Sequence, residues 1–305
     1  MSRVGGALMG GAFWRKARKL ARLLGNPAFR RGLRFGVAAA IEHRTILGAL
    51  PVATVIDVGA NTGQFSLLAA SLYRNAAIHA VEPLPAAAAV FTRLFADSAR
   101  VRLHRVAAGA GTANAPLHVS RRHDCSSLLP IAGGQTDFAP GSEAVRTITV
   151  PVRPLDELIA PDDLVRPVLL KLDVQGGELQ ALQGAGRLLA SVDHVYVEVS
   201  FLPLYDGQPL AHAVVEHLAG HGFGLAGTNH PTFDRAGRCV QVDLLFSRLP
   251  AAATHLHGRP ATEPGLRETA LTEADQEAEI APYPPIAAAS SPSPAMASPA
   301  GCGRT

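Results

Sequence analysis

The stretch that sets the fold is Val55-Ile56-Asp57-Val58-Gly59-Ala60-Asn61-Thr62-Gly63-Gln64-Phe65. An apolar run ends near an acid, a glycine-spaced turn follows, and a second apolar segment begins almost at once. This order is typical of a buried parallel strand that leads through a tight turn into a helix, which we expect to start near Thr62. Gly59 and Gly63 would let a ligand approach the backbone closely, and the first N–H groups of the helix would point toward that ligand. The stretch therefore predicts an α/β protein with a nucleotide-like ligand in this turn.

Further along the chain, strand-like and helix-like segments alternate, as they do in doubly wound α/β folds. We expect strands over 52–58, 78–81, 101–107, 116–120, 147–152, 168–174, 194–199, 223–226 and 240–246, and helices over 62–73, 85–95, 178–189 and 209–218. Residues 121–145 show no steady period and are predicted to form an irregular loop. A hairpin-like segment over 230–237 joins the last two strands, so we expect the sheet to end with an antiparallel strand.

Composition divides the 305 residues into three parts. Residues 1–50 are a basic extension with helical character, because ten Lys and Arg residues stand there against the single acid Glu42. Residues 51–249 are the α/β domain. Residues 250–305 are rich in Ala, Pro and Ser, cannot bury a core, and are predicted to be disordered.

Apolar residues at helical spacing between Phe13 and Leu24 predict an amphipathic helix with Arg and Lys on its other side. Two interpretations stay open. The helix could pack its apolar stripe on the core, or it could lie in weak peripheral contact with an anionic membrane surface. Aromatic residues do not interleave with basic ones through the rest of the chain, which argues against a nucleic-acid partner.

The compartment is predicted from what the sequence contains. Three widely spaced cysteines form neither a metal pattern nor a disulfide framework, as expected for a reducing cytosol. No apolar run is long enough for a membrane span, and a weakly apolar start followed by Arg15 and Lys16 is unlike a signal peptide. We expect a cytoplasmic protein, with contact at the inner membrane face as the open alternative.

The ligand follows from Glu82, which ends the second strand nineteen residues after Gly63. An acid at this position accepts hydrogen bonds from the ribose hydroxyl groups of a bound nucleoside. The turn lacks the Gly-x-Gly-x-x-Gly spacing that a dinucleotide pyrophosphate needs, and the chain has no Gly-Lys-Ser/Thr phosphate loop. A nucleoside without phosphates that carries a zwitterion fits better, which indicates S-adenosylmethionine.

Several motifs resemble the FkbM family of S-adenosylmethionine-dependent methyltransferases. They are Ile56 to Phe65, Val81-Glu82-Pro83, Leu170 to Glu178, Val197-Glu198-Val199-Ser200, Leu204 to Leu210 and Asp243-Leu244-Leu245-Phe246. The resemblance covers residues 50–248. It implies a Rossmann-like class I methyltransferase sheet of seven strands, the last one antiparallel, with helices on both faces. It departs from the family at Gly177, where a large residue is usual, and we expect a wider pocket beside Asp173 there.

The resemblance also implies roles for individual residues. Gly59, Asn61 and Gly63 would line the methionine end of the cofactor, and Glu82 would hold its ribose. Asp57 would anchor the turn or reach the cofactor through water. Ser126 lies in a Ser-Ser-Leu segment similar to the family's and is a candidate wall of the site, although an ordinary polar turn is the alternative.

An alcohol acceptor needs a group that takes its proton. Lys171, Asp173 and Glu178 lie at or just beyond the end of the 168–174 strand, where such folds bind ligands. Asp173 is our first candidate for the base or for the contact to the cofactor's ammonium group, and Glu198 is the second. Lys171 and Asp173 could instead form a structural ion pair, and Glu178 could simply favour the start of a helix. No metal is predicted, although Asp173 and Glu198 could supply oxygen ligands.

The resemblance implies an O-methyltransferase that acts on a hydroxyl of a sugar, in a glycolipid or oligosaccharide, or of a polyketide-type product. The acceptor would be a small molecule or a lipid-linked glycan. Two alternatives stay open at this point. One is a methyltransferase-like module that binds without catalysis, and the other is a nicotinamide-dependent oxidoreductase, against which the glycine spacing argues.

Overall fold

The computed structural model describes residues 23–250 of the chain. Most of the predicted basic helix and the whole of the predicted disordered tail after residue 250 lie outside these residues, so both stay predictions. Within the described range, none of the helices has the length and apolar character needed to cross a bilayer.

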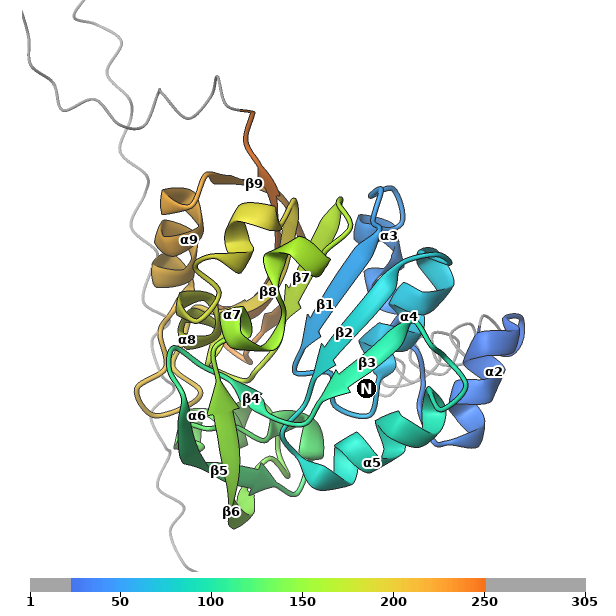
Figure 1. Ribbon diagram of the computed structural model, residues 1–305. Coiled ribbons are helices and arrows are strands. Elements are labelled where there is room, and N and C mark those ends of the chain that lie inside the picture. Colours follow the sequence, from blue (N-terminus) through green and yellow to red (C-terminus); the bar gives the residue numbers. More distant parts are fainter. Residues whose placement is uncertain (1–22, 251–305) are drawn as a thin grey trace, which may run out of the picture. The chain divides into compact units, whose positions relative to one another are not determined.

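The central sheet has seven strands: β1 (Thr54–Val58), β2 (Ala77–Val81), β3 (Val101–His104), β7 (Val168–Leu172), β8 (His194–Ser200), β9 (Phe223–Phe233) and β10 (Cys239–Arg248). Their order is β3-β2-β1-β7-β8-β10-β9. The strands from β3 to β8 pair in parallel, whereas β10 is antiparallel to both β8 and β9 (Figure 1). The prediction of a seven-stranded sheet with an antiparallel last strand is confirmed.

Helices cover both faces of the sheet. Successive residues of each buried strand point to opposite sides, so each face carries apolar side chains that a helix must cover. Ile56 and Val58 pack into one core with α8 (Glu178–Gln183) and α9 (Ala211–Gly220). Val55 packs into a second core with α4 (Gln64–Leu72) and α3 (Arg44–Leu47). The helix α5 (Pro85–Leu94) follows β2, and α7 (Leu155–Leu158) precedes β7. All five residues of β1 are buried, so side chains on both faces of this strand pack in the interior. This is why its sequence does not alternate between apolar and polar residues.

A second, three-stranded sheet was not expected. It consists of β4 (Ala107–Ala108), β6 (Ala144–Arg153) and β5 (Ala113–Ser120), in that order. Two of its strands had been predicted as isolated segments, and β4 had been assigned to the end of the third main strand. Leu117, Val119, Val150 and Val152 pack on Leu84 and Ala87, and this contact holds the small sheet near the ends of β1 and β2 (Figure 1).

Two local predictions need correction. The helix α4 begins at Gln64 and not near Thr62, because Gly63 has a left-handed φ of 102° that a helix cannot contain. The stretch 121–145 is not wholly irregular, since it contains the 3₁₀ turn His123–Cys125 and α6 (Gly133–Phe138), and its end belongs to β6.

The described part of the N-terminal extension packs on the domain. Phe29 of α2 (Pro27–Arg34) and Val37 are buried with Leu67 and Leu68 of α4 in one cluster. After them the short 3₁₀ helix Ile41–His43 leads into α3. Residues 23–50 therefore share a core with the sheet, and we keep the boundary near residue 50 as a proposal about sequence organisation only.

Candidate active site

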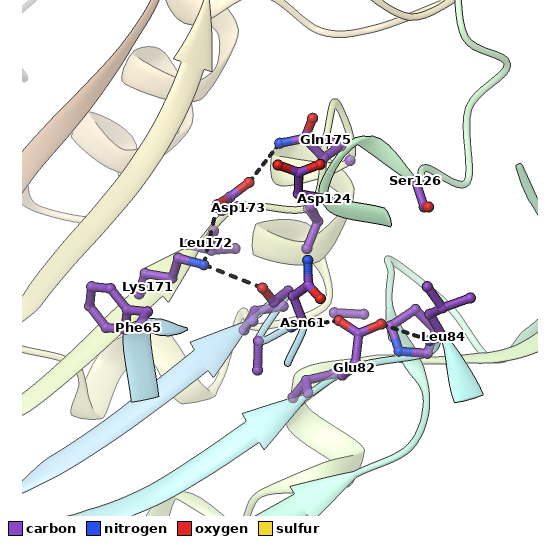
Figure 2. A pocket seen from close by; sticks show the side chains of 18 of the residues that line it. Asn61, Phe65, Glu82, Leu84, Asp124, Ser126, Lys171, Leu172, Asp173 and Gln175 are labelled. Atoms are coloured by element: carbon purple, nitrogen blue, oxygen red, sulfur yellow. Dashed lines mark hydrogen bonds and ion pairs between the residues drawn. The ribbon is translucent and has the colours of Figure 1, made fainter. Parts of the chain in front are cut away.

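A cavity of about 310 Å³ lies at the carboxyl ends of β1, β2 and β7. Its walls come from the turn after β1, the segment 81–84 after β2, residues 171–177 after β7, and the loop over 123–128. Figure 2 shows Glu82 on one side of this pocket, Lys171 and Asp173 on the other, and Asn61 between them. Parallel strands of an open sheet bring these segments together because their carboxyl ends share one edge.

The turn after β1 depends on its glycines for two different reasons. Gly59 has φ of 80°, and a Cβ there would overlap the carbonyl oxygen of Asp173, so no other residue fits between the two strand ends. Gly63 has φ of 102°, and its Cβ would lie 2.9 Å from the ring of Phe95. Gly59 and Asn61 line the pocket, whereas Gly63 packs against α5 and shapes the turn from behind.

Glu82 lies at the bottom of the pocket with only 6% of its surface exposed. One carboxylate oxygen accepts the N–H of Asn61 at 2.8 Å and the other accepts the N–H of Leu84 at 2.7 Å. Burial nevertheless raises the pKa of Glu82 to about 7, because these two donors offset only part of the desolvation. A ligand that offered further hydroxyl donors would stabilise the charged carboxylate.

Lys171 lies between two acids. Its Nζ is 3.4 Å from Asp57 Oδ1, 3.5 Å from Asp173 Oδ2, and 3.4 Å from the carbonyl oxygen of Gly59. Burial lowers the pKa of Lys171, but Asp173 and Asp57 raise it by more, so the amine stays charged. The ion pair that we considered between Lys171 and Asp173 is present, and it extends to Asp57.

Asp57 does not line the pocket. Its side chain is fully buried, and it accepts a hydrogen bond of 2.6 Å from Ser66 Oγ of α4. Through Ser66 and Lys171 it connects β1 to the helix and to β7. This arrangement favours the anchoring role over a contact with the cofactor.

Asp173 and Glu198 are joined by a glutamine. Gln175 Nε2 donates to Asp173 Oδ1 at 2.7 Å and to Glu198 Oε2 at 3.2 Å. Asp173 lines the pocket, and 39% of its side chain is exposed. Glu198 lies behind Gln175, outside the lining, and also accepts from Gln241. Burial raises the pKa of Glu198 well above its ordinary range, and Asp173 and Asp243 raise it further.

The 123–128 loop closes the pocket from the side of the small sheet. Ser126 lines it, and its hydroxyl accepts the backbone N–H of Ser120 at 3.1 Å. Ser127 Oγ donates to the carbonyl oxygen of Gln175 at 2.6 Å, which ties this loop to the end of β7. Asp124 also lines the pocket.

Glu178 serves the turn rather than the pocket. Its carboxylate accepts the N–H of Val174 at 3.0 Å and that of Gly176 at 3.0 and 3.2 Å, and burial raises its pKa to about 7. Gly177 does line the pocket, and a Cβ built there would meet only Val174, at 3.5 Å. The site therefore has room for a side chain that this protein lacks.

The sequence prediction missed one wall of the pocket. It is formed by Glu42, His43, Phe65, Tyr196 and Asp243. These residues come from the 3₁₀ helix before α3, from α4, and from β8 and β10. An acid within the apolar run of β10 was visible in the sequence, but nothing there indicated that the N-terminal extension supplies its neighbours.

The FkbM methyltransferase domain model matches residues 57–225, more than half of the chain. This protein belongs to the FkbM methyltransferase family. It is 27% identical over 198 residues to the 2-O-methyltransferase NoeI of Sinorhizobium fredii, a match that covers 62% of this chain and 82% of NoeI.

Two further relatives are similar over shorter shares of the chain. The hexuronic acid methyltransferase AglP of Haloferax volcanii is 30% identical over 145 residues, covering 47% of this chain and 54% of AglP. The 31-O-demethyl-FK506 methyltransferase FkbM of Streptomyces tacrolimicus is 27% identical over 210 residues, covering 60% of this chain and 77% of that protein. Our protein is accordingly an S-adenosylmethionine-dependent methyltransferase, and neither the oxidoreductase nor the non-catalytic alternative stands.

The pocket fits this cofactor. Glu82 presents a buried carboxylate for ribose hydroxyls, the turn at Gly59 and Asn61 has no bulky side chain in the way, and the half-exposed Asp173 can pair with an ammonium group. When bound, the cofactor supplies an electrophilic methyl group on a sulfonium. The protein's own contribution is to orient the two reactants, exclude water and accept a proton. Among residues 23–250 no cluster of His, Cys, Asp and Glu is arranged to hold a metal ion.

Proposed function

We propose that this FkbM-family protein transfers the methyl group to a hydroxyl oxygen of a sugar, presented as an oligosaccharide or a lipid-linked glycan. The observation that carries transfer to an oxygen is the match to NoeI, which is named a 2-O-methyltransferase and is covered over 82% of its length. AglP, whose name specifies a hexuronic acid, supports a carbohydrate acceptor.

The polarity of the pocket supports the same class of acceptor. Asp124, Asp173 and His43 line it together with the apolar Leu84 and Leu128. A sugar carries several hydroxyl donors, and carboxylates are strong acceptors for them. The room beside Gly177 would admit a ring substituent next to Asp173.

A polyketide hydroxyl, which the resemblance to the FkbM family implies, is the second candidate, and the relative FkbM is named for 31-O-demethyl-FK506. A large, mostly apolar acceptor of this kind would need more of the wall around Leu84 and Leu128 than a sugar does. The two candidates differ in the acceptor only, since both use the same cofactor and the same hydroxyl chemistry.

The test is methyl transfer from radiolabelled S-adenosylmethionine to a panel of neutral oligosaccharides, uronic-acid oligosaccharides, lipid-linked glycans and macrolide polyols. We expect label in a carbohydrate class, with NMR of the product showing a new O-methyl group. Label only in the macrolides would move the proposal to the second candidate. Label on nitrogen or carbon would overturn O-methyl transfer altogether. Gly59→Ala is the matched inactive control, because its turn cannot form.

We also propose that the protein acts in the cytoplasm, with weak contact at the inner membrane face through the basic segment before residue 23. Residues 1–22 carry six Lys and Arg and no acid, which supports this contact. Co-sedimentation with phosphatidylglycerol vesicles should be seen at low salt and be lost in high salt. Equal sedimentation of a chain lacking residues 1–22 would contradict it.

A further inference from the structure

The wall of the pocket that the sequence did not predict carries a histidine bound to a carboxylate. His43 Nδ1 lies 2.8 Å from the Tyr196 hydroxyl and 3.3 Å from Asp243 Oδ2. The Tyr196 hydroxyl donates to the same Asp243 oxygen at 2.8 Å and accepts from Asn229 Nδ2 at 2.9 Å. The four side chains come from four different elements, so the chain reaches this arrangement only when folded.

The network assigns the proton on the imidazole. The single proton of the Tyr196 hydroxyl goes to the Asp243 carboxylate, so Tyr196 can only accept from His43. Asp243 Oδ2 is also an acceptor. His43 therefore carries its proton on Nδ1, and Nε2 is the nitrogen that can take another one. A carboxylate beside Nδ1–H fixes this tautomer and stabilises the imidazolium that forms.

His43 belongs to the pocket that holds the cofactor-binding residues. It lines the same cavity as Asn61, Glu82 and Asp173, and 20% of its side chain is exposed. The centroid of the Phe65 ring lies 5.9 Å from the imidazole centroid of His43 and 5.4 Å from Lys171 Nζ. Other titratable groups that face this region are Glu42, Lys171, Tyr196, His230 and Asp243.

The acids favoured by the sequence are less suited to accept a proton. Asp173 is engaged at Oδ1 by Gln175 at 2.7 Å and at Oδ2 by Lys171 at 3.5 Å, so both of its oxygens already have a partner. Glu198 lies outside the pocket lining. His43 lines the pocket and pairs with Asp243, so its imidazole is placed to take the proton.

We propose that His43, held by Asp243 and Tyr196, is the group that takes the proton of the acceptor hydroxyl. This role rests on the proposed hydroxyl methylation. The acceptor oxygen forms its bond to the methyl carbon, and the carbon–sulfur bond breaks with its electron pair going to sulfur. The hydroxyl proton goes to His43 Nε2, and the positive charge passes from sulfonium to an imidazolium paired with Asp243. Asp243 and Tyr196 are positioning residues.

The first test needs no acceptor. Long-range ¹H–¹⁵N NMR of the histidine rings, with S-adenosylhomocysteine present, should show His43 in the Nδ1–H tautomer, assigned by its loss in His43→Gln. Asp243→Asn should weaken or change this tautomer. A proton found on Nε2 of neutral His43 would overturn the proposal, whatever the protein methylates.

The second test uses the acceptor class that wild type labels. His43→Gln should lower kcat by roughly 10²- to 10³-fold, the range of a lost general base, and leave the Kd for S-adenosylmethionine within about twofold. We expect the kcat of wild type to rise with pH, as it does for a general base that must be neutral, and this rise should be absent in His43→Gln. His212→Gln, on the exposed face of α9, is the matched control and should behave as wild type.

The outcomes separate this proposal from the function itself. If wild type labels no hydroxyl, the proposed function fails, and the NMR result still decides the state of His43. If wild type is active and His43→Gln keeps both kcat and the pH profile, His43 is not the base. A fall in kcat that accompanies an equal loss of cofactor affinity would show a structural role and would also overturn the proposal.

Discussion

Gln175 Nε2 donates a hydrogen bond of 2.7 Å to Asp173 Oδ1, and this bond holds a carboxylate that lines the pocket. The same side chain accepts from the Tyr205 hydroxyl at 2.6 Å through its other end. Gln175 has φ of 56°, a left-handed conformation that few non-glycine residues adopt. Such a backbone persists where surrounding contacts hold it, and here Ser127 and Tyr205 do so through hydrogen bonds to Gln175.

We therefore expect Gln175→Leu to destabilise the folded protein at this side of the pocket. It removes the nearer acceptor of the Tyr205 hydroxyl, which keeps only the carbonyl oxygen of Cys125 at 3.3 Å, and it removes the donor that the Asp173 and Glu198 carboxylates share. We expect a loss of about 1–3 kcal/mol in unfolding free energy, measured by urea denaturation. Gln183→Leu, on an exposed position of α8, is the control. Equal stability of the two variants would contradict the role given to Gln175.

The buried Glu82 predicts a pH dependence of cofactor binding. Burial raises the pKa of its carboxylate to about 7 in the free protein, and ribose hydroxyls donate to the ionised form. The affinity for S-adenosylmethionine should therefore fall as pH drops below about 7, by at most tenfold per pH unit. Calorimetric titrations at pH values between about 5.5 and about 8.5, which span the titration of the Glu82 carboxyl, would measure this dependence of affinity on pH.

Glu82→Gln is the control for this titration. It should bind roughly 10- to 100-fold more weakly at pH 8, because charge-assisted hydrogen bonds become neutral ones, and its Kd should not follow pH in this way. The effect of pH on the stability of the free protein has the opposite sign to its effect on cofactor affinity. An acid whose pKa is raised on folding makes stability fall as pH rises from the unfolded value toward about 7.

Lys171→Met should be strongly destabilising. It leaves Asp57, which is fully buried, with Ser66 as its remaining partner. An uncompensated buried charge costs about 3–5 kcal/mol, measured as the loss of unfolding free energy. Adding Asp57→Asn to the variant should recover part of that loss. Arg187→Met removes an exposed ion pair with Asp156 and should cost less than about 1 kcal/mol.

Gly59→Ala should abolish cofactor binding. Its backbone has φ of 80°, and the added methyl group would overlap the carbonyl oxygen of Asp173, so the turn and the end of β7 would have to separate. We expect no measurable heat of binding with S-adenosylmethionine and a lower Tm. Gly186→Ala, where nothing lies within 4 Å of the added carbon, should bind normally. Normal binding by Gly59→Ala would show that the turn adapts.

Local patterns predicted much of the cofactor side of the site. The strand-turn-helix pattern around Gly59 and the acid at Glu82 are contiguous features, and the parallel sheet brings them together by a general rule. The same rule placed Asp173 at the pocket. It could not tell that Glu198, on the next strand, would be covered by Gln175, because this depends on the left-handed turn at residue 175.

The acceptor side was beyond the reach of sequence patterns. His43 and Asp243 are two hundred residues apart, and their contact depends on how the N-terminal segment packs its Phe29 and Val37 on α4. Neither residue lies in a repeated or glycine-marked motif. Periodicity and spacing encode the strands, the turn and the ligand class, because these arise from neighbouring residues. The meeting of His43 with Asp243 arises from long-range packing, which the fold alone settles.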